Sequence, residues 1–324
     1  MWSRRSFLYN AALSSTATLW STSAVATSWP SRTIKVIVPF GPGGSADVVA
    51  RYVAKALQEK LAETIVIENR TGAAGTIGTA AVAKSEPDGY TLLAISNTIT
   101  ANETLRTNRP YKLMQDLQPV ALFNVAYNTL VVPPPSPFKN LSELIDAAKK
   151  QPGKLNYATS GVGSVYHIIG ETFRSAAGIK VQHIPFRSSD QARTAVLSGA
   201  VDYMFDAIPT MVESIRGNSV RALATTGPER DPLLPEIPAV SETIPGFAGT
   251  IWIGLLAPAG TPKAIVERLN KEINLIVGSN ESLAWQTKLG FHPTTKTVVE
   301  FEQFLKRDIE QQRQWINAAN ITAE

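Results

Sequence analysis

The residues of this 324-residue chain with the clearest chemical potential lie in glycine-rich loops that precede helical patterns. The first loop is Pro39-Phe40-Gly41-Pro42-Gly43-Gly44-Ser45-Ala46-Asp47. Glycines let a ligand approach backbone N–H groups closely, and the N-terminus of a helix attracts anions. No Gly-Lys-Ser/Thr follows, so the loop is not a nucleotide P-loop. The loop therefore predicts an anion site, with the alternative that the glycines only make the turn and that Ser45 and Asp47 only cap the helix.

A later loop, Ser160-Gly161-Val162-Gly163-Ser164, has the same design of glycines, a hydroxyl group and a helix start. His167 follows one helical turn after Ser164, so it can face the same ligand; the alternative is an ordinary capping or interfacial histidine. Arg187 follows a strand pattern and so falls at a strand's C-terminal end, where open α/β sheets bind ligands. The alternative for Arg187 is a solvated surface arginine.

A third loop, Gly72-Ala73-Ala74-Gly75-Thr76-Ile77-Gly78, resembles a dinucleotide-binding loop because it follows a strand and opens a helix. Its spacing is G-x-x-G-x-x-G, whereas the dinucleotide fingerprint is G-x-G-x-x-G. The spacing favours tight strand-to-helix packing over a nucleotide site.

Patterns typical of catalytic and metal centres are missing from the sequence. There is no cysteine and no G-x-S-x-G, which excludes thiol nucleophiles, Cys-ligated metals and an α/β-hydrolase elbow. The three histidines, His167, His183 and His292, are too few and too scattered for a multi-histidine metal site. The acidic residues show no metal-loop spacing. We therefore expect no catalytic residues, no metal and no cofactor.

The overall composition is that of an ordinary folded protein. Hydrophobic residues make up 44% and charged residues 18%, which excludes a mainly disordered, collagenous or coiled-coil chain. The formal net charge is +4, and no run of Lys or Arg is longer than two residues. The charge pattern therefore does not indicate a nucleic-acid partner.

The first 26 residues have the pattern of an export signal. Arg4 and Arg5 precede a weakly apolar stretch, and Ala24-Val25-Ala26 has the form of a cleavage site. The arginine pair resembles a twin-arginine signal, with an ordinary secretion signal as the alternative. We expect cleavage after Ala26 and an exported mature protein. No later stretch approaches the ~18 apolar residues of a membrane helix, so the mature protein is expected to be soluble.

Short apolar runs alternate with amphipathic helical patterns along the mature chain. Strands are expected over residues 33–38, 64–67, 91–95, 130–132, 155–158, 180–184, 201–205 and 250–256. Helices are expected over residues 45–61, 77–85, 141–150, 165–176, 190–198, 262–277 and 298–317. This alternation predicts parallel sheets covered on both faces.

The repeated set of elements predicts two α/β domains. The first comprises residues 27–127 plus 251–324, and the second residues 128–250. The chain therefore crosses between the domains near residues 127 and 250.

Motifs along nearly the whole mature chain resemble those of tripartite tricarboxylate transporter receptors, also called Bug receptors. They occupy residues 29–32, 38–47, 68–78, 87–92, 199–206, 221–224 and 252–262. The resemblance implies a type II periplasmic-binding-protein fold, with a two-segment hinge and a ligand cleft between the domains. It also implies capture of a small carboxylate, largely by backbone N–H groups and ordered water.

The resemblance further implies which positions face the ligand. In the first domain they are Phe40, Gly43, Gly44, Ser45, Ala46, Asp47 and Asn97; in the second they are Ser160, Gly161, Val162, Gly163, Ser164, His167, Phe186, Arg187 and Asp206. Residues 184–188 read Ile-Pro-Phe-Arg-Ser where the family usually has Val-Pro-Tyr-Lys-Gly. This departure affects the identity of the ligand more than the binding role.

The leading hypothesis is a monomeric, non-enzymatic periplasmic receptor that delivers a carboxylate to membrane permease subunits. One alternative is an exported cofactor-binding oxidoreductase, because the twin-arginine route carries folded cofactor proteins. Another is a sensor or scavenger that hands its ligand to a signalling partner.

Overall fold

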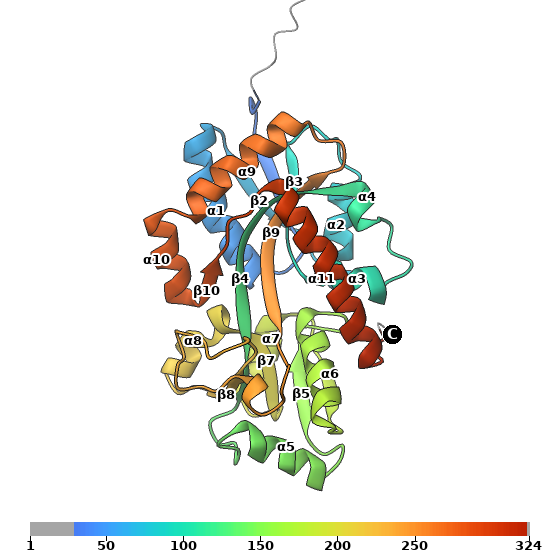
Figure 1. The fold of residues 1–324 in the computed structure, drawn as a ribbon, viewed down its shortest axis with the longest axis vertical. Coiled ribbons are helices and arrows are strands. Elements are labelled where there is room, and N and C mark those ends of the chain that lie inside the picture. Colours follow the sequence, from blue (N-terminus) through green and yellow to red (C-terminus); the bar gives the residue numbers. More distant parts are fainter. Residues whose placement is uncertain (1–28, 323–324) are drawn as a thin grey trace, which may run out of the picture.

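The computed structural model describes residues 29–322, which form two lobes stacked along the long axis of the molecule (Figure 1). Lobe 1 is built from both ends of the chain. It contains β1 (Ile34–Val38), α1 (Ser45–Leu61), β2 (Ile65–Asn69), η1 (Ala73–Gly75), α2 (Thr76–Ala83), β3 (Thr91–Ser96), α3 (Thr98–Leu105), α4 (Leu113–Asp116), β9 (Thr250–Pro258), α9 (Lys263–Val277), α10 (Asn280–Leu289), β10 (Phe291–Pro293) and most of α11 (Val298–Ala318).

Lobe 2 is built from the middle of the chain. It contains α5 (Leu141–Lys150), β5 (Asn156–Thr159), α6 (Val165–Ala177), β6 (Gln182–Pro185), α7 (Ser189–Leu197), β7 (Tyr203–Ala207), α8 (Ile208–Arg216), β8 (Arg221–Thr225) and η2 (Val240–Glu242). The long strand β4 (Leu117–Val132) belongs to both lobes. The expected export signal, residues 1–26, lies outside the described residues.

The first helix shows how the sequence pattern produces these elements. In α1, Val49, Val53, Leu57 and Leu61 recur every four residues and are all at most 5% exposed. This spacing places them on one face of the helix, which packs on the sheet of lobe 1. The helix ends at Ala62, whose φ of 54° takes the backbone out of the helical region.

The sheets are mixed, whereas the alternating pattern predicted parallel ones. Within lobe 1, β1 pairs in parallel with β2 and β3, and within lobe 2, β5 pairs in parallel with β6 and β7. Strands β4 and β9 are antiparallel to each other and to their neighbours. In lobe 1, β9 therefore runs against β1, β2 and β3, while β4 runs in their direction. In lobe 2, β4 runs against β5, β6 and β7.

β4 changes partners in its middle. Up to Tyr127 it pairs with β9, and from Asn128 it pairs with β7. We propose that the domain boundaries lie here and near Thr250, where β9 begins, as the sequence suggested. The division into residues 27–127 plus 251–324 and 128–250 rests on this exchange of partners.

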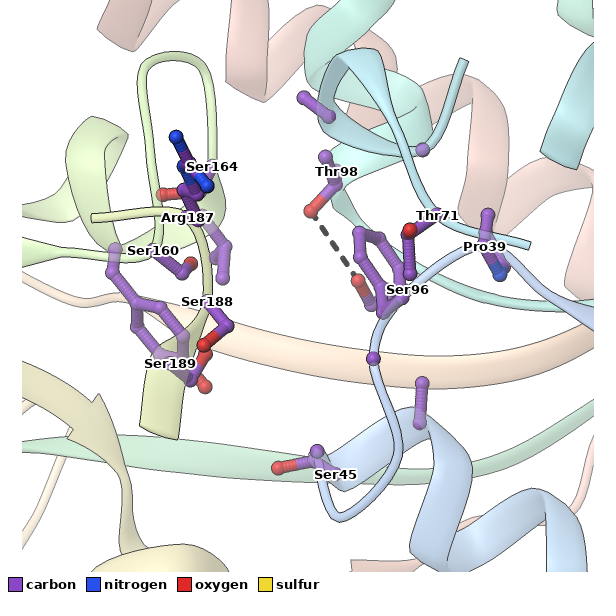
Figure 2. Close-up of a pocket in the computed structure, with 18 of the residues that line it drawn as sticks. Pro39, Ser45, Thr71, Ser96, Thr98, Ser160, Ser164, Arg187, Ser188 and Ser189 are labelled. Atoms are coloured by element: carbon purple, nitrogen blue, oxygen red, sulfur yellow. Dashed lines mark hydrogen bonds between the residues drawn. The ribbon is translucent and has the colours of Figure 1, made fainter. Parts of the chain in front are cut away.

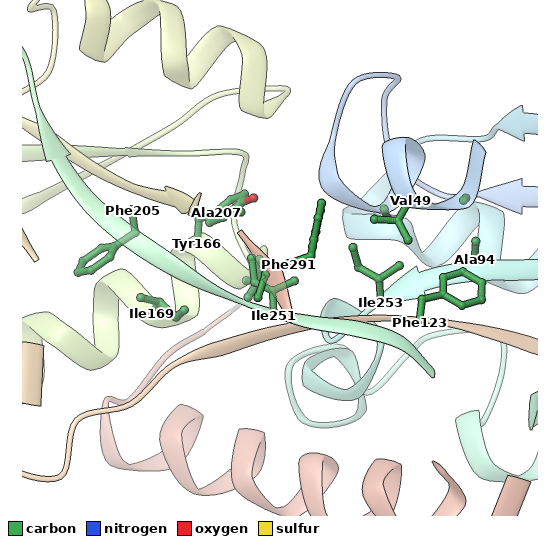
Figure 3. Close-up of a cluster of buried hydrophobic side chains, with 14 of the residues drawn as sticks. Val49, Ala94, Phe123, Tyr166, Ile169, Phe205, Ala207, Ile251, Ile253 and Phe291 are labelled. Atoms are coloured by element: carbon green, nitrogen blue, oxygen red, sulfur yellow. The ribbon is translucent and has the colours of Figure 1, made fainter. Parts of the chain in front are cut away.

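The hydrophobic core is continuous through both lobes (Figure 3). Val49 and Phe123 lie in lobe 1, Ile169 and Phe205 lie in lobe 2, and Ile251 lies between them. A second connection lies outside the two strands, where the end of α11 packs against α6 and α3. Its buried members are Ala101, Ile168, Ile316, Ala319 and Ile321. The lobes therefore also touch away from the two crossing segments that the sequence indicated.

Within residues 29–322, no helix is both long enough and apolar enough to span a bilayer.

Candidate functional site

A cavity of about 210 Å³ lies between the two lobes (Figure 2). From lobe 1 it is lined by residues 39–42, 44–46 and 71–75 together with Ser96, Thr98 and Ile251. From lobe 2 it is lined by Ser160, residues 164–166 and residues 187–190. Hydroxyl groups from both lobes therefore face one space of a size suited to a small solute.

Four helices begin at this cavity, two from each lobe. In lobe 1, α1 starts at Ser45 and α3 starts at Thr98, after β1 and β3 respectively. In lobe 2, α6 starts after Ser164 and α7 starts at Ser189, after β5 and β6. The C-terminal ends of parallel strands carry these turns, which is where open α/β sheets bind ligands. The N–H groups of the first helical turns make this space favourable for an anion.

The loop of lobe 1 is held by a buried carboxylate. Asp47, 3% exposed, accepts a hydrogen bond from the Gly43 N–H at 3.0 Å and another from Asn69 Nδ2 at 2.8 Å. Asn69 Nδ2 also donates to the carbonyl of Phe40, and Arg51 forms an ion pair with Asp47 at 2.9 Å. Burial alone would raise the pKa of Asp47, but the hydrogen bonds from Arg51, Gly43 and Asn69 lower it below its ordinary value. Asp47 therefore stays ionised and fixes the loop.

The loop of lobe 2 is held by an imidazole and a hydroxyl group. His167 Nδ1 accepts a hydrogen bond from the Gly163 N–H at 3.1 Å, and Thr159 Oγ1 accepts one from the Gly161 N–H at 3.2 Å. Ser164 caps α6 by accepting from the His167 N–H at 3.3 Å. Gly161 and Gly163 have φ of 112° and 78°, which is the region that favours glycine. The glycines are therefore needed for the path of the loop.

The structure brings seven of the sixteen expected positions to the cavity wall. These are Phe40, Gly44, Ser45, Ala46, Ser160, Ser164 and Arg187. The other nine lie outside the lining: Gly43, Asp47, Asn97, Gly161, Val162, Gly163, His167, Phe186 and Asp206. Asp206 is fully buried and paired with Arg193 Nε at 2.6 Å, and Asn97 Nδ2 donates to the carbonyl of Thr250. Several of these positions therefore support the wall from behind.

Several parts of the wall were missed by sequence reasoning, including Val165, Tyr166 and Ile251. Residues 71–75 line the cavity, although their spacing favoured packing alone. Ala73 and Ala74 have φ of 47° and 50°, which is uncommon for residues other than glycine and is not signalled by alanine. Ser96 and Thr98, and residues 188–190 at the start of α7, were also missed. Serine before a helical pattern is a capping signal and could have indicated the α7 turn.

The lining contains few charged groups. Arg187 is exposed, and within residues 29–322 no carboxylate lies within ion-pair distance of it. Asp190 also lines the cavity, but it is paired with Arg193 at 2.6 Å. The Oγ of Ser45 is buried and has no hydrogen-bond partner in the described part of the chain. No cluster of potential metal ligands occurs among residues 29–322. The lining therefore combines neutral donors with one cation, Arg187, and one carboxylate that is already paired with Arg193.

Comparisons with known proteins identify a family and several solved structures that are similar to this chain. A model of the tripartite tricarboxylate transporter family receptor matches residues 49–321. Protein BugT of Bordetella pertussis is 35% identical over 288 residues, which cover 88% of each chain. The structure of R. palustris Rpa4515 with adipate has a TM-score of 0.88 at 29% identity, covering 91% of this chain and 99% of that one. MatC from Rhodopseudomonas palustris with bound malate has a TM-score of 0.83 at 32% identity, covering 89% and 99%.

The chain therefore belongs to the tripartite tricarboxylate transporter receptor family. The resemblance seen in the sequence motifs is confirmed, and so is the two-lobed α/β fold, which is also that of the periplasmic binding protein BugD, at 31% identity and a TM-score of 0.85 over 91% of this chain and 100% of that one.

Proposed function

We propose that this member of the receptor family is an exported, periplasmic solute-binding protein that captures a small carboxylate between its lobes and presents it to membrane permease subunits. The observation that carries the proposal is the convergence of four helix N-termini, two from each lobe, on one cavity. The adipate and malate bound in two relatives support the same class of ligand.

Backbone N–H groups supply most of the proposed binding energy. A helix N-terminus contributes about 0.3–1 kcal/mol toward an anion, and up to ~2 kcal/mol where the site is partly buried. A hydrogen bond to a charged group adds about 1.5–3 kcal/mol. Contributions from both lobes are enough for roughly micromolar binding, about −8 kcal/mol, after the costs of association.

The residues proposed to contact the ligand are those of the cavity wall. The hydroxyls of Ser45, Ser96, Thr98 and Ser164 are suited to one carboxylate, together with nearby backbone N–H groups. Arg187 is drawn beside Ser164 on the lobe 2 side, across the cavity from Ser96 and Thr98, and is suited to a second acidic group (Figure 2). The nine positions behind the wall are proposed to hold the loops in place.

We further propose that the protein acts without catalysis and as a monomer. Ser45 Oγ has no base within hydrogen-bond distance in the described residues, so this serine is not an activated nucleophile. The turn at residues 71–75 faces the cavity, but it lacks the spacing by which a backbone cradles a pyrophosphate.

Calorimetry on the mature protein tests the proposed ligand class. Adipate and malate serve as probes, and their diamides, which have the same length without charge, serve as controls. We expect binding of at least one dicarboxylate and none of either diamide. Equal binding of acid and diamide, or a native mass spectrum of gently purified protein carrying a nucleotide, would contradict the proposal.

Closure of the lobes is tested by small-angle scattering. The two strands that cross between the lobes allow rigid-body bending of the hinge type, and the contact of α11 with α6 has to shift in the same motion. Saturating ligand is expected to reduce the radius of gyration. Identical profiles for verified free and bound samples would contradict closure.

A further inference from the structure

Two stacked histidines lie directly behind the ligand loop of lobe 2. The rings of His167 and His183 have their centroids 4.2 Å apart, with an interplanar angle of 20°. His167 Nδ1 accepts from the Gly163 N–H, and His183 Nε2 lies 2.6 Å from Thr159 Oγ1. Thr159 in turn accepts from the Gly161 N–H. Both glycine N–H groups of the loop therefore depend on this pair of imidazoles, one directly and one through a hydroxyl.

The same backbone device occurs in lobe 1 with a different acceptor. Gly43 and Gly163 both have φ of 78°, and the residues after them, Gly44 and Ser164, have φ, ψ of −74°, 161° and −70°, 160°. In each case the glycine N–H donates to a side chain four residues later in the following helix. That acceptor is a carboxylate in lobe 1 and an imidazole in lobe 2, which makes the lobe 1 loop an internal control.

The imidazole can serve as an acceptor only while it is neutral. A backbone N–H can only donate, so Nδ1 of His167 must carry a lone pair toward Gly163. A proton on Nδ1 would turn the acceptor into a donor and leave two donors facing each other. We propose that His167 is a positioning residue for the ligand loop of lobe 2, and that its protonation releases this loop and weakens ligand binding in mild acid.

The surroundings keep both rings neutral near pH 7. Burial lowers the pKa of His167, and burial together with the neighbouring His167 lowers the pKa of His183 to about 4. The other titratable or charged groups around the pair are Glu171 and Arg174 on α6 and Tyr157 on β5, which stacks on His183. Tyr203 on β7 stacks on Tyr157, and Arg106 at the end of α3 lies against the loop at Gly163. Glu171 raises both pKa values, but its carboxylate already accepts from Tyr157 and Arg174. The rings of His167 and His183 are therefore protonated only at acid pH.

Only the consequence for ligand affinity rests on the proposed function, so the loop itself is tested without ligand. The mature protein is labelled with ¹⁵N at glycine and histidine, and its amide and ring signals are followed from pH 7.5 to 4.5. We expect the Gly163 amide to shift together with the His167 ring, while the Gly43 amide stays unchanged. A Gly163 amide that stays fixed while the ring titrates, or a ring that does not titrate above pH 4.5, would overturn the inference.

Two variants separate positioning from simple packing. His167→Asn supplies an acceptor that does not titrate, on a side chain as long as that of Asp47, which accepts from Gly43 in lobe 1. His167→Leu supplies no acceptor. With adipate and malate as probes, the parent protein is expected to lose about tenfold in affinity between pH 7.5 and 5.0, which corresponds to one lost hydrogen bond. His167→Leu should be weakened by about tenfold at both pH values. His167→Asn should bind more tightly than His167→Leu and lose the extra acid dependence.

Protonation of the probe itself affects all three proteins alike, so the difference between parent and His167→Asn reports on the protein alone. The same acid dependence in the parent and in His167→Asn would overturn the inference. If neither probe binds the parent protein, the proposed ligand class fails, and the NMR titration still decides the role of His167.

Discussion

The glycine loops of the two lobes share one backbone and differ in what holds it. In lobe 1 the acceptor is Asp47, which is fixed by Arg51 and Asn69. In lobe 2 it is His167, which is stacked on another imidazole. The comparison shows that this turn requires an acceptor four residues after the glycine but leaves its chemistry open. One loop is held by a carboxylate whose pKa lies below its ordinary value of 3.8, and the other by an imidazole that can be protonated in milder acid.

The two loops also differ at the position that starts each helix. Gly44 has no side chain and lines the cavity, whereas Ser164 caps its helix with its own hydroxyl group. The loop of lobe 1 therefore presents bare backbone to the ligand, and the loop of lobe 2 presents a side chain. We therefore expect ligand binding to be more sensitive to a side chain added at Gly44 than to a change of side chain at Ser164.

The largest expected effect comes from removing the lobe 1 acceptor. Asp47→Ala leaves Gly43, Asn69 and Arg51 without their common partner. Loss of one member of a buried, hydrogen-bonded pair is expected to lower the free energy of unfolding by about 3 kcal/mol, measured by urea denaturation. Asp47→Asn keeps an acceptor and should lose about 1 kcal/mol. Equal losses for the two variants would show that the charge, rather than the hydrogen bond to Gly43, holds the loop.

The next largest effect is expected from adding a side chain at Gly44, where the backbone of lobe 1 lines the cavity. Gly44 has an ordinary extended conformation, and an added Cβ would meet only the carbonyl of Gly41 at 3.6 Å. Gly44→Val should therefore fold normally but project into the cavity, with a loss of affinity of about 100-fold, or ~2.7 kcal/mol. Gly44→Ser copies lobe 2 and should lose less. Calorimetry alongside thermal unfolding separates binding from folding, and unchanged affinity in Gly44→Val would contradict the site.

The pH dependence of stability should separate the two lobes. The pKa of His183 falls from an ordinary value near 6.5 to about 4 in the folded protein. The unfolded chain therefore binds more protons in this interval, and the free energy of unfolding falls as the pH drops from about 6.5 to 4. The expected loss is on the order of 1–2 kcal/mol, because His183 is partly exposed and solvent screening reduces the effect.

Asp47 should act in a lower range. Its pKa is below its ordinary value of 3.8, so its contribution is present above that pH and is lost as the pH falls further. Urea unfolding of His183→Phe between pH 7 and 4 tests the division. This variant should lose the part of the slope above pH 4 that His183 contributes and keep a smaller slope from His167, whose pKa is also lowered by burial. An unchanged slope would assign the acid sensitivity to another group.

The smallest effect is expected at Arg187. Its guanidinium is exposed, so Arg187→Gln should weaken dicarboxylate binding by only about 1.5- to fivefold, because exposed charge pairs contribute about 0.2–1 kcal/mol. A monocarboxylate of the same length should bind the variant and the parent protein alike. The ratio of the two affinities, measured by calorimetry, checks whether Arg187 faces a second acidic group.

Much of the fold was predictable because local signals agree with the final structure. The four-residue spacing in α1 and the residues 141–150 of α5 match the expected helices, and β1 is within one residue of its expected start. β4 was recognised only over 130–132, because Pro119, Asn124 and Asn128 interrupt its apolar pattern. These residues are accommodated by long-range pairing with β9 and β7, which a local pattern cannot show.

The site was predictable in outline, since glycine and serine before helices indicate exposed N–H groups. The sequence could not show which of these residues form the wall and which stand behind it. The side chain of His167 accepts from the N–H of Gly163, which has a positive φ, and the inner face of residues 71–75 depends on the conformations of Ala73 and Ala74. Both outcomes depend on backbone angles that residue types leave open.

The position of β9 has a consequence for the order in which the protein is made. β9 lies between β3 and β4 in the sheet, although it follows them far along the chain, and the sheet strands of lobe 2 are complete by Thr225. From the end of β3 at Ser96 to the end of β9 at Pro258, a ribosome working at about 5–20 residues per second needs roughly 8–30 s. During synthesis, lobe 2 can therefore form first, while the nascent lobe 1 presents unpaired strand edges that can pair with other chains.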